Sequence, residues 1–182
     1  AAGRSAEIVY SPLDALRLAQ ENPTRQIVFV GVGFETTTPL VAMAIKRARA
    51  MGLANFTVYG AHKNMPGALE VIINDPALKL DALILPGHVS TIIGAEPYRF
   101  LAEKYGIPGV ITGFEPVDVL QGIAMIMRQL HEGRAEIEIA YARGVMPEGN
   151  PVALAAIDEV FETCSATWRG LGEIPGSGYR IR

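Results

Sequence analysis

The chain has 182 residues, of which 49% are hydrophobic and 19% charged, and this suits one domain with a sizeable core, with or without an appendage. Its net charge of −3, without a long basic run, argues against nucleic acid as a partner, and no apolar run reaches the roughly 18 residues that a membrane span needs. A single cysteine, Cys164, excludes an internal disulfide and a multi-cysteine metal site, and residues 1–14 lack the apolar core of a secretory signal, so the predicted location is the cytoplasm.

Helical and strand-like segments alternate in the first half of the chain. Ser11 is a suitable N-cap, and with Pro12 at the first helical position it begins a helix that Asn22-Pro23 ends. After it we expect a strand, a helix, a second strand and a second helix, over 26–32, 38–52, 55–60 and 65–75. The strands are rich in β-branched and aromatic residues, as strands buried in a sheet are.

The second half continues the same alternation. We expect a strand, a turn with a helix, a strand, a helix and an edge strand, over 80–86, 87–106, 107–113, 116–133 and 135–142. The helix over 116–133 has an apolar stripe at three- and four-residue spacing: Val117, Leu120, Ala124, Met127 and Leu130.

Strands that alternate with helices of this length predict βαβ units, with right-handed crossovers and a parallel sheet. The expected fold is therefore α/β, a Rossmann-like three-layer α/β/α domain with a mostly parallel sheet, over residues 1–148. Residues 149–182 are expected to form a C-terminal helix and an irregular, Gly/Pro-rich connecting tail.

The tripeptide Gly-Phe-Glu occurs twice, at 33–35 and 113–115, each time directly after a predicted strand. In a parallel sheet the loops after the strands emerge at one edge, where ligands bind beside helix N-termini. The polar residues of these loops should therefore project at the same end of the domain: Glu35, His62, Lys63, His88 and Glu115.

The first loop, "GFETTTP", allows two interpretations. It can be a cradle for an anion or a polar ligand, in which free backbone N–H groups face the loop. Alternatively, Thr36, Thr37 or Thr38 only caps the next helix and Glu35 only accepts loop hydrogen bonds. The glycines of "GVGFET" do not match the dinucleotide pattern GxGxxG, because Thr36 stands where the third glycine belongs.

The loop "PGHVSTIIG" places His88 between Gly87 and Val89, with Ser90 and Thr91 able to cap a helix. Histidine donates, accepts or ligates near neutral pH, so His88 is a candidate for a polar site. The alternative is a histidine that is hydrogen-bonded to a loop carbonyl.

The remaining histidines and the cysteine are weaker candidates. His62 beside Lys63 carries less signal than His88, and His131 suits the C-terminal end of a helix without a further function. Cys164 is expected to be buried and inert, because no neighbouring base can be identified for a catalytic thiol.

Two alternative functions follow from the same residues. Two glutamates and two histidines at one sheet edge suggest a free-standing metal-dependent hydrolase, although helical His-x-x-x-His spacing and an aspartate cluster are absent. An edge strand and a tail that dock partners would instead suggest a protein-interaction domain.

Four motifs, "GFETTTP", "LPGHVSTIIG", "TGFEPVDVL" and "WRGLGEIPGSG", resemble in this order and spacing the HypD family of hydrogenase maturation factors, over essentially the whole chain. The resemblance implies a scaffold for building the Fe(CN)2CO group of NiFe hydrogenases, with a HypC-type chaperone and a HypE-type cyanide donor as partners. It also implies a parent about twice as long, with two α/β domains facing a cleft, a region that binds a 4Fe-4S cluster, and thiols in an N-terminal stretch resembling GPGCPVC.

By this resemblance the chain is a central segment, the second α/β domain with its connecting tail, flanked by N- and C-terminal parts of its parent. It is expected to hold no cofactor and to turn over no substrate alone, since neither cysteine set is present and Cys164 matches none of the family's functional cysteines. The implied cleft wall comprises Gly33, Phe34, Glu35, Thr36 and Thr37 from the first motif, Gly87, His88, Val89 and Ser90 from the second, and Gly113, Phe114 and Glu115 from the third.

An iron centre that carries cyanides presents nitrogen acceptors, which backbone N–H groups and histidine or threonine donors can bind. The carboxylates can position a donor or relay a proton. We therefore predict Glu35, His88 and Glu115 as the acting residues of the site.

Overall fold

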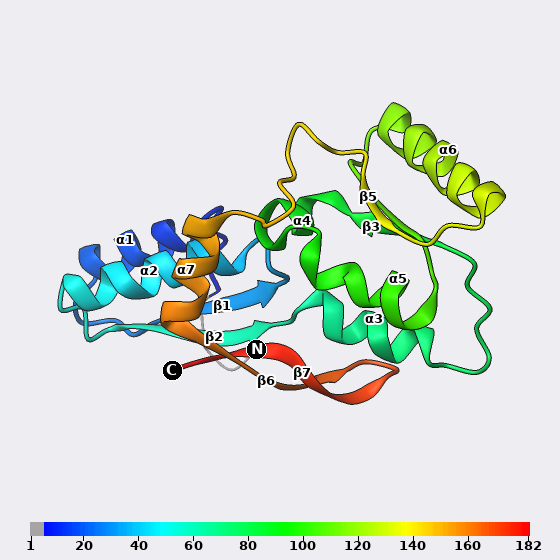
Figure 1. Cartoon of the computed structure of the whole chain (residues 1–182). Helices are drawn as coiled ribbons and strands as arrows, with labels where there is room; N and C mark the ends of the chain where they lie inside the picture. Colours follow the sequence, from blue (N-terminus) through cyan, green and yellow to red (C-terminus); the bar gives the residue numbers. More distant parts are fainter. Residues whose placement is uncertain (1–5) are drawn as a thin grey trace.

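A computed structural model describes residues 6–182 of the chain, in which helices and strands alternate along most of the length (Figure 1). The helices are α1 (Pro12–Glu21), α2 (Thr38–Ala50), α3 (Met65–Ile73), α4 (Gly87–Ile93), the 3₁₀ helix η1 (Glu96–Tyr98), α5 (Arg99–Tyr105), α6 (Pro116–Glu132) and α7 (Pro151–Val160). The strands are β1 (Ile27–Gly33), β2 (Phe56–His62), β3 (Leu83–Pro86), β4 (Gly109–Thr112), β5 (Ile137–Ile139), β6 (Phe161–Trp168) and β7 (Gly172–Ile181). The predicted α/β class with mostly parallel strands is confirmed.

The strands form two parallel sheets and one antiparallel hairpin, where a single parallel sheet was expected. β1 pairs with β2, and β3, β4 and β5 form a second sheet with β5 at its edge, as predicted. β2 is not paired with β3. Instead β7 packs beside β2, and Lys63 forms a bridge with Gly178.

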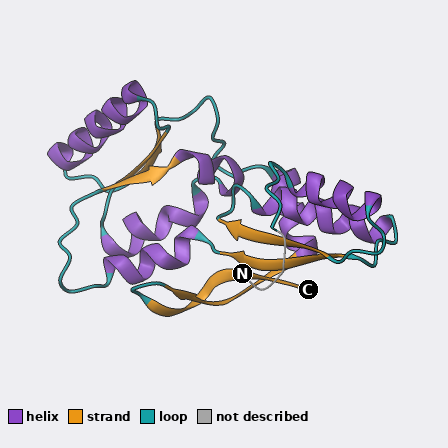
Figure 2. Cartoon of the chain, turned by 180° about the vertical axis from the view of Figure 1, so that it is seen from behind, coloured by secondary structure: helices purple, strands orange, loops and turns teal. Residues whose placement is uncertain are grey.

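The expectation of an irregular tail after α7 is wrong. β6 and β7 pair in antiparallel register from Phe161 with Ile181 to Trp168 with Gly172, and the hairpin runs beneath β2 and α3 (Figures 1 and 2). These strands are hard to predict from the sequence because the hairpin is rich in glycine and in small polar residues. Its buried and exposed positions therefore differ little in hydrophobicity, and the alternation typical of a strand is weak.

Three hydrophobic clusters form the core. One lies between α1, α2 and β2, and includes Leu16 and Phe56. A second joins α2 to α7 and β6, and includes Val41 and Phe161. A third surrounds β3, β4, α4 and α5, and includes Tyr98. Residues 149–182 therefore share a core with α2, although they were set apart from residues 1–148 on sequence grounds.

The apolar stripe predicted on α6 faces solvent. Its members Val117, Leu120, Met127 and Leu130 are exposed, whereas the buried positions of the helix are Asp118, Gly122, Ile126 and Gln129. Gly122 allows the close approach to β4, since any Cβ there would lie 2.2 Å from Cγ2 of Thr112. α6 consequently lies at the periphery of the molecule (Figure 1).

Within residues 6–182, every helix is too short or too polar to cross a lipid bilayer.

Candidate functional site

The first motif forms a tight loop between β1 and α2. Gly33 has φ +151°, and any Cβ there would lie 2.2 Å from Oγ1 of Thr37, so only glycine fits without a shift. The hydroxyls of Thr37 and Thr38 both donate to the carbonyl of Phe34, at 3.1 and 2.9 Å. The expected capping of α2 by a threonine side chain is therefore absent at its N-cap Thr37, and the hydroxyls close the loop instead.

Glu35 lies beneath the surface, with 1% of its area exposed. Its Oε1 accepts a hydrogen bond from the backbone N–H of Met65 at 2.9 Å, at the start of α3. Its Oε2 is buried without a hydrogen-bond partner among residues 6–182. Burial raises the pKa of Glu35, and the backbone hydrogen bonds offset this only in part.

Two tyrosines lie within range of the electrostatic effect of Glu35. The hydroxyl of Tyr98 is buried and has no hydrogen-bond partner in the described part of the chain. Burial raises the pKa of Tyr98 and of Tyr179, and the nearby charge of Glu35 raises both further. Sequence patterns did not single out either tyrosine, since both come from segments outside the post-strand loops.

His62, the last residue of β2, is also buried, with 2% of its area exposed. Both ring nitrogens lack a hydrogen-bond partner within residues 6–182, and burial lowers the pKa of His62, which favours the neutral ring. His62 thus lies at the end of β2, beside the end of β1, with its ring buried.

The fourth motif packs directly on the first. The ring of Trp168 lies 6.0 Å from the ring of Phe34, and Nζ of Lys63 lies 5.0 Å above the Trp168 ring and donates to the carbonyl of Thr167. Nε1 of Trp168 donates to Oγ of Ser177 at 2.8 Å, which holds the two strands of the hairpin together. The fourth motif, which lies more than a hundred residues after "GFETTTP" in the sequence, is therefore its neighbour in space.

The second motif begins the helix α4 at once, and a break at Gly94 and Ala95 separates it from η1 and from α5, whose C-cap is Gly106. His88 lies in the first turn of α4, where Oγ of Ser90 donates to the carbonyl of Pro86 at 2.8 Å. Ser90 was expected to be able to cap the helix, but its side chain does not do so. The His88 side chain is exposed, and its ring meets that of Phe114 edge-on at 4.6 Å and that of Tyr141 at 6.0 Å.

A close approach of the backbone brings the second and third motifs together, because any Cβ at Gly87 would lie 2.2 Å from the carbonyl oxygen of Thr112. Within the third motif, any Cβ at Gly113 would lie 2.0 Å from Oδ2 of Asp118. The ends of the adjacent strands β3 and β4 therefore present His88 and Glu115 on one rim, as the sequence predicts.

An arginine from the loop after β5 fixes the Glu115 side of this rim. Arg143 donates to both carboxylate oxygens of Asp118 at 2.7 Å and to Oε2 of Glu115 at 2.8 Å. Its guanidinium lies 4.5 Å above the ring of Tyr141. The hydrogen bonds from Arg143 lower the pKa of Asp118, so this carboxylate stays charged.

Sequence reasoning missed Asp118, Tyr141 and Arg143. A signal for the last two exists, because "AYARG" follows β5 as the other candidate loops follow their strands. The rule applied to the other four strands would have found Arg143, whereas Tyr141 falls inside the strand expected over 135–142.

Glu35 is not part of the exposed rim. The two regions are linked through the hydrophobic cluster around Leu85 and Tyr98, to which Val89 of the second motif belongs and against which Phe34 of the first motif packs. The structure thus brings His88, Phe114 and Glu115 together at the surface and places Glu35 in the interior.

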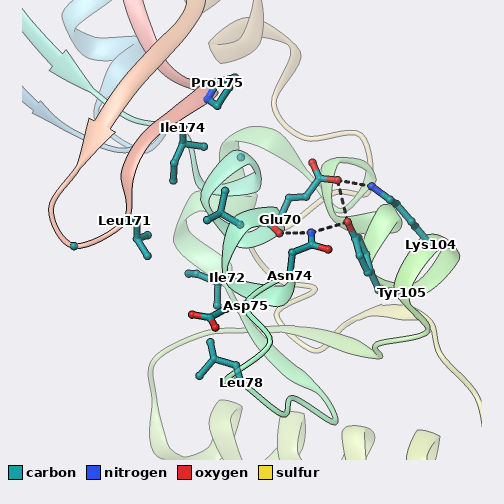
Figure 3. Close-up of a pocket in the computed structure, with 13 residues that line it drawn as sticks. Glu70, Ile72, Asn74, Asp75, Leu78, Lys104, Tyr105, Leu171, Ile174 and Pro175 are labelled. Carbon is teal, nitrogen blue, oxygen red and sulfur yellow. Dashed lines mark hydrogen bonds and ion pairs between the residues drawn. The ribbon is translucent and has the colours of Figure 1, made fainter.

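A separate cavity of about 910 Å³ lies between the end of α3, the end of α5 and the tip of the hairpin (Figure 3). Glu70 joins its two helices, because it accepts hydrogen bonds from Nζ of Lys104 at 2.7 Å and from the hydroxyl of Tyr105 at 3.1 Å. Leu171 and Ile174 of the fourth motif form the opposite wall, and none of the predicted site residues lines this cavity.

The described residues contain no cluster of three or more His, Cys, Asp or Glu side chains arranged to hold a metal ion. Cys164 lies in β6 and is half-buried, so the expectation of a buried cysteine is wrong. A 4Fe-4S cluster takes four thiolates, and the single cysteine of this chain does not fit one.

Comparison with known proteins gives consistent matches along the whole chain. The family model HypD, described as "Hydrogenase formation hypA family", matches residues 1–182. The chain is 55% identical over 183 residues to the hydrogenase maturation factor HypD of Rhodobacter capsulatus, 47% identical over 184 residues to the hydrogenase expression/formation protein HupD of Azotobacter chroococcum, and 43% identical over 182 residues to HypD of Escherichia coli K12.

These matches cover 100%, 98% and 100% of the chain but 48%, 48% and 49% of the respective relatives. The chain therefore spans about half the length of the curated relatives it matches. The alternative of a metal-dependent hydrolase finds no support among them.

Proposed function

Because the chain belongs to the HypD family of hydrogenase maturation factors, we propose that its 182 residues form one wall of the scaffold on which the Fe(CN)2CO group of NiFe hydrogenases is assembled. The iron group is the cargo of this scaffold. The observation that carries the proposal is the meeting of the second and third motifs, in which the exposed His88 ring contacts Phe114 beside Glu115.

His88 and Glu115 are the residues of the rim that reach the cargo. The His88 ring is held between two aromatic rings, so an imidazole N–H has a defined direction in which to donate to a cyanide nitrogen. Arg143 orients the Glu115 carboxylate, which is exposed and can accept a proton or a hydrogen bond.

Glu35 acts as a positioning residue. It ties the loop of the first motif to the start of α3 through the N–H of Met65, and its raised pKa favours a buried, uncharged carboxyl group. Loss of this contact would shift the first motif relative to the rim.

The rest of the assembly comes from outside these residues. We place the iron-binding thiols and the 4Fe-4S cluster in the full-length parent protein, which would carry out the redox steps of the assembly. Its partners would be the HypC-type chaperone and the HypE-type cyanide donor, and its location the cytoplasm. The 182 residues alone supply one cleft wall and are not expected to turn over a substrate.

The test introduces substitutions into a full-length family protein that carries these 182 residues and measures the activity of the hydrogenase it matures. We expect His88→Ala to abolish maturation and Glu35→Ala, which removes the acceptor for the Met65 N–H, to do the same, while both proteins stay folded by circular dichroism. The matched control is His131→Ala, because His131 lies at the exposed end of α6 and has no assigned role. Normal maturation by both His88→Ala and Glu35→Ala would refute the proposed site.

A further inference from the structure

The parallel sheet β1–β2 is covered on one face only. α1, α2 and α7 lie over the face that carries Phe29 and Val58, and these two side chains pack against two of the hydrophobic clusters (Figure 1). Parallel sheets in α/β proteins are normally covered on both faces. The opposite face of this sheet is therefore the place to look for a missing layer.

Apolar side chains occupy that opposite face. Val28, Val30 and Val32 of β1 are 59%, 60% and 64% exposed, and Tyr59, which lies opposite Val30 on β2, is 67% exposed. Thr57 pairs with Val28 on the same face, so none of these five positions carries a charge. Single exposed apolar residues are common, but a contiguous group on two paired strands indicates an interaction surface.

The outer edge of β1 is open as well. Among residues 6–182, β1 is hydrogen-bonded to a strand on one side only, that of β2. Beside this edge lies a groove of about 560 Å³, bordered by residues 6–9, by α1 and by residues 25–30. An unpaired strand edge of this kind is a template for another strand.

The length of the relatives indicates what covers this surface. The chain accounts for 48% of the Rhodobacter capsulatus protein, so that relative contains about as many residues again. This is ample for a strand and a layer of helices. The uncharged face requires an apolar partner surface, such as the buried stripe of an amphipathic helix.

We propose that the part of the family-length chain outside these 182 residues completes the β1–β2 sheet: an apolar helical face covers Val28, Val30 and Val32, and a strand pairs with the outer edge of β1. The inference rests on family membership and on the structure of the sheet, and it does not depend on the role proposed for His88 or Glu115.

The first test compares hydrogen exchange in two unsubstituted proteins, the 182-residue chain and a full-length family protein that contains it. The amides of residues 28–32 that do not bond to β2 should exchange with solvent in the short chain and be strongly protected in the full-length protein. Equal exchange of these amides in the two proteins would overturn the proposal.

The second test uses Val30→Glu with Val152→Glu as a matched control, because Val152 is a 78% exposed valine on the outer side of α7. Both substitutions should leave the thermal midpoint of the short chain nearly unchanged. In the full-length protein only Val30→Glu should lower the midpoint, because it buries a charge. Equal midpoints for the two full-length variants would contradict an intramolecular cover.

Other occupants give different results. If a second copy covered the face, the short chain would form a concentration-dependent dimer that Val30→Glu disrupts, and the full-length protein would tolerate the substitution. A separate partner protein would leave the residue 28–32 amides of the isolated full-length protein unprotected. Either result would overturn the proposal.

Discussion

Glu35 combines a structural cost with the positioning role that we propose for it. One carboxylate oxygen is satisfied by the Met65 N–H, and the other is buried without a hydrogen-bond partner among residues 6–182. Buried polar atoms without partners are rare in folded proteins and concentrate at functional sites. This cost suggests that Glu35 is retained for the function of the first motif and not for stability.

The pH dependence of stability tests this view of Glu35. Its pKa is raised in the folded state, so from about 4.3, the ordinary carboxylate value, upward the folded chain binds more protons at this site than the unfolded chain. The contribution of Glu35 to stability is therefore complete below that pH and is lost as the pH rises through the raised pKa. Glu35→Gln removes this loss while it keeps an acceptor for Met65.

We expect Glu35→Gln to increase the free energy of unfolding at pH 8 by about 1 kcal/mol relative to its effect at pH 4.5, a magnitude typical of one buried hydrogen-bonding group. Urea unfolding across this pH range measures the difference. Glu148→Gln is the control, because Glu148 is exposed. Parallel stability curves for Glu35→Gln and the unsubstituted chain would show that burial of Glu35 has no energetic cost.

The location of His88 and Glu115 at the ends of adjacent strands could be predicted, because both residues follow strands and the strands proved to be neighbours. The position of Glu35 could not be predicted in the same way. Its carboxyl group is held by the N–H of Met65 at the start of α3, thirty residues further along the chain. Periodicity within one segment carries no information about such contacts.

At the scale of elements, glycines determine how closely the second motif approaches its neighbours. Gly87 begins α4 where the end of β3 lies against the end of β4, and a Cβ would meet the Thr112 carbonyl. We expect Gly87→Ala to destabilise the chain by about 1 to 3 kcal/mol, as overpacking of buried sites does, and to separate His88 from Phe114. Urea unfolding measures the first effect and nuclear Overhauser contacts between the two rings measure the second.

Gly60→Ala is the matched control for this prediction. A Cβ at Gly60 would have its nearest neighbour, Cδ1 of Ile181, at 3.8 Å, which is an ordinary contact. The control should therefore leave both the stability and the ring contact close to those of the unsubstituted chain. A Gly87→Ala chain that behaves like Gly60→Ala would show that this approach tolerates a methyl group.

The elements themselves were largely predictable, whereas their assembly was not. Helix α1 begins as predicted, since Oγ of Ser11 accepts from the Leu13 N–H at 3.1 Å. The hairpin β6–β7 was missed because its residues are small and polar, and the outward stripe of α6 was unforeseen because an amphipathic pattern does not say which face is buried. Strand order is a long-range property, so the division into two parallel sheets also lay beyond local patterns.

At the scale of the whole molecule, the C-terminal segment connects parts that are distant in sequence. α7 packs on α2, and β7 packs on both β2 and α3 (Figure 2). Phe161, 1% exposed, belongs to the cluster that also contains Val41 and Ala42 of α2. Residues 149–182 therefore contribute to the same core as α2, the helix that follows the first motif.

This arrangement predicts that residues 1–148 do not fold without residues 149–182. Removal of the segment would expose Val41 and Ala42 and would leave the Phe34 ring without Trp168. We expect the shortened chain to lose its cooperative thermal transition and to bind the dye ANS, as molten states do. Phe161→Ala in the intact chain is a milder version, expected to cost about 3 to 5 kcal/mol. A cooperative transition of residues 1–148 alone would instead establish them as an independent domain, with the C-terminal segment as an appendage.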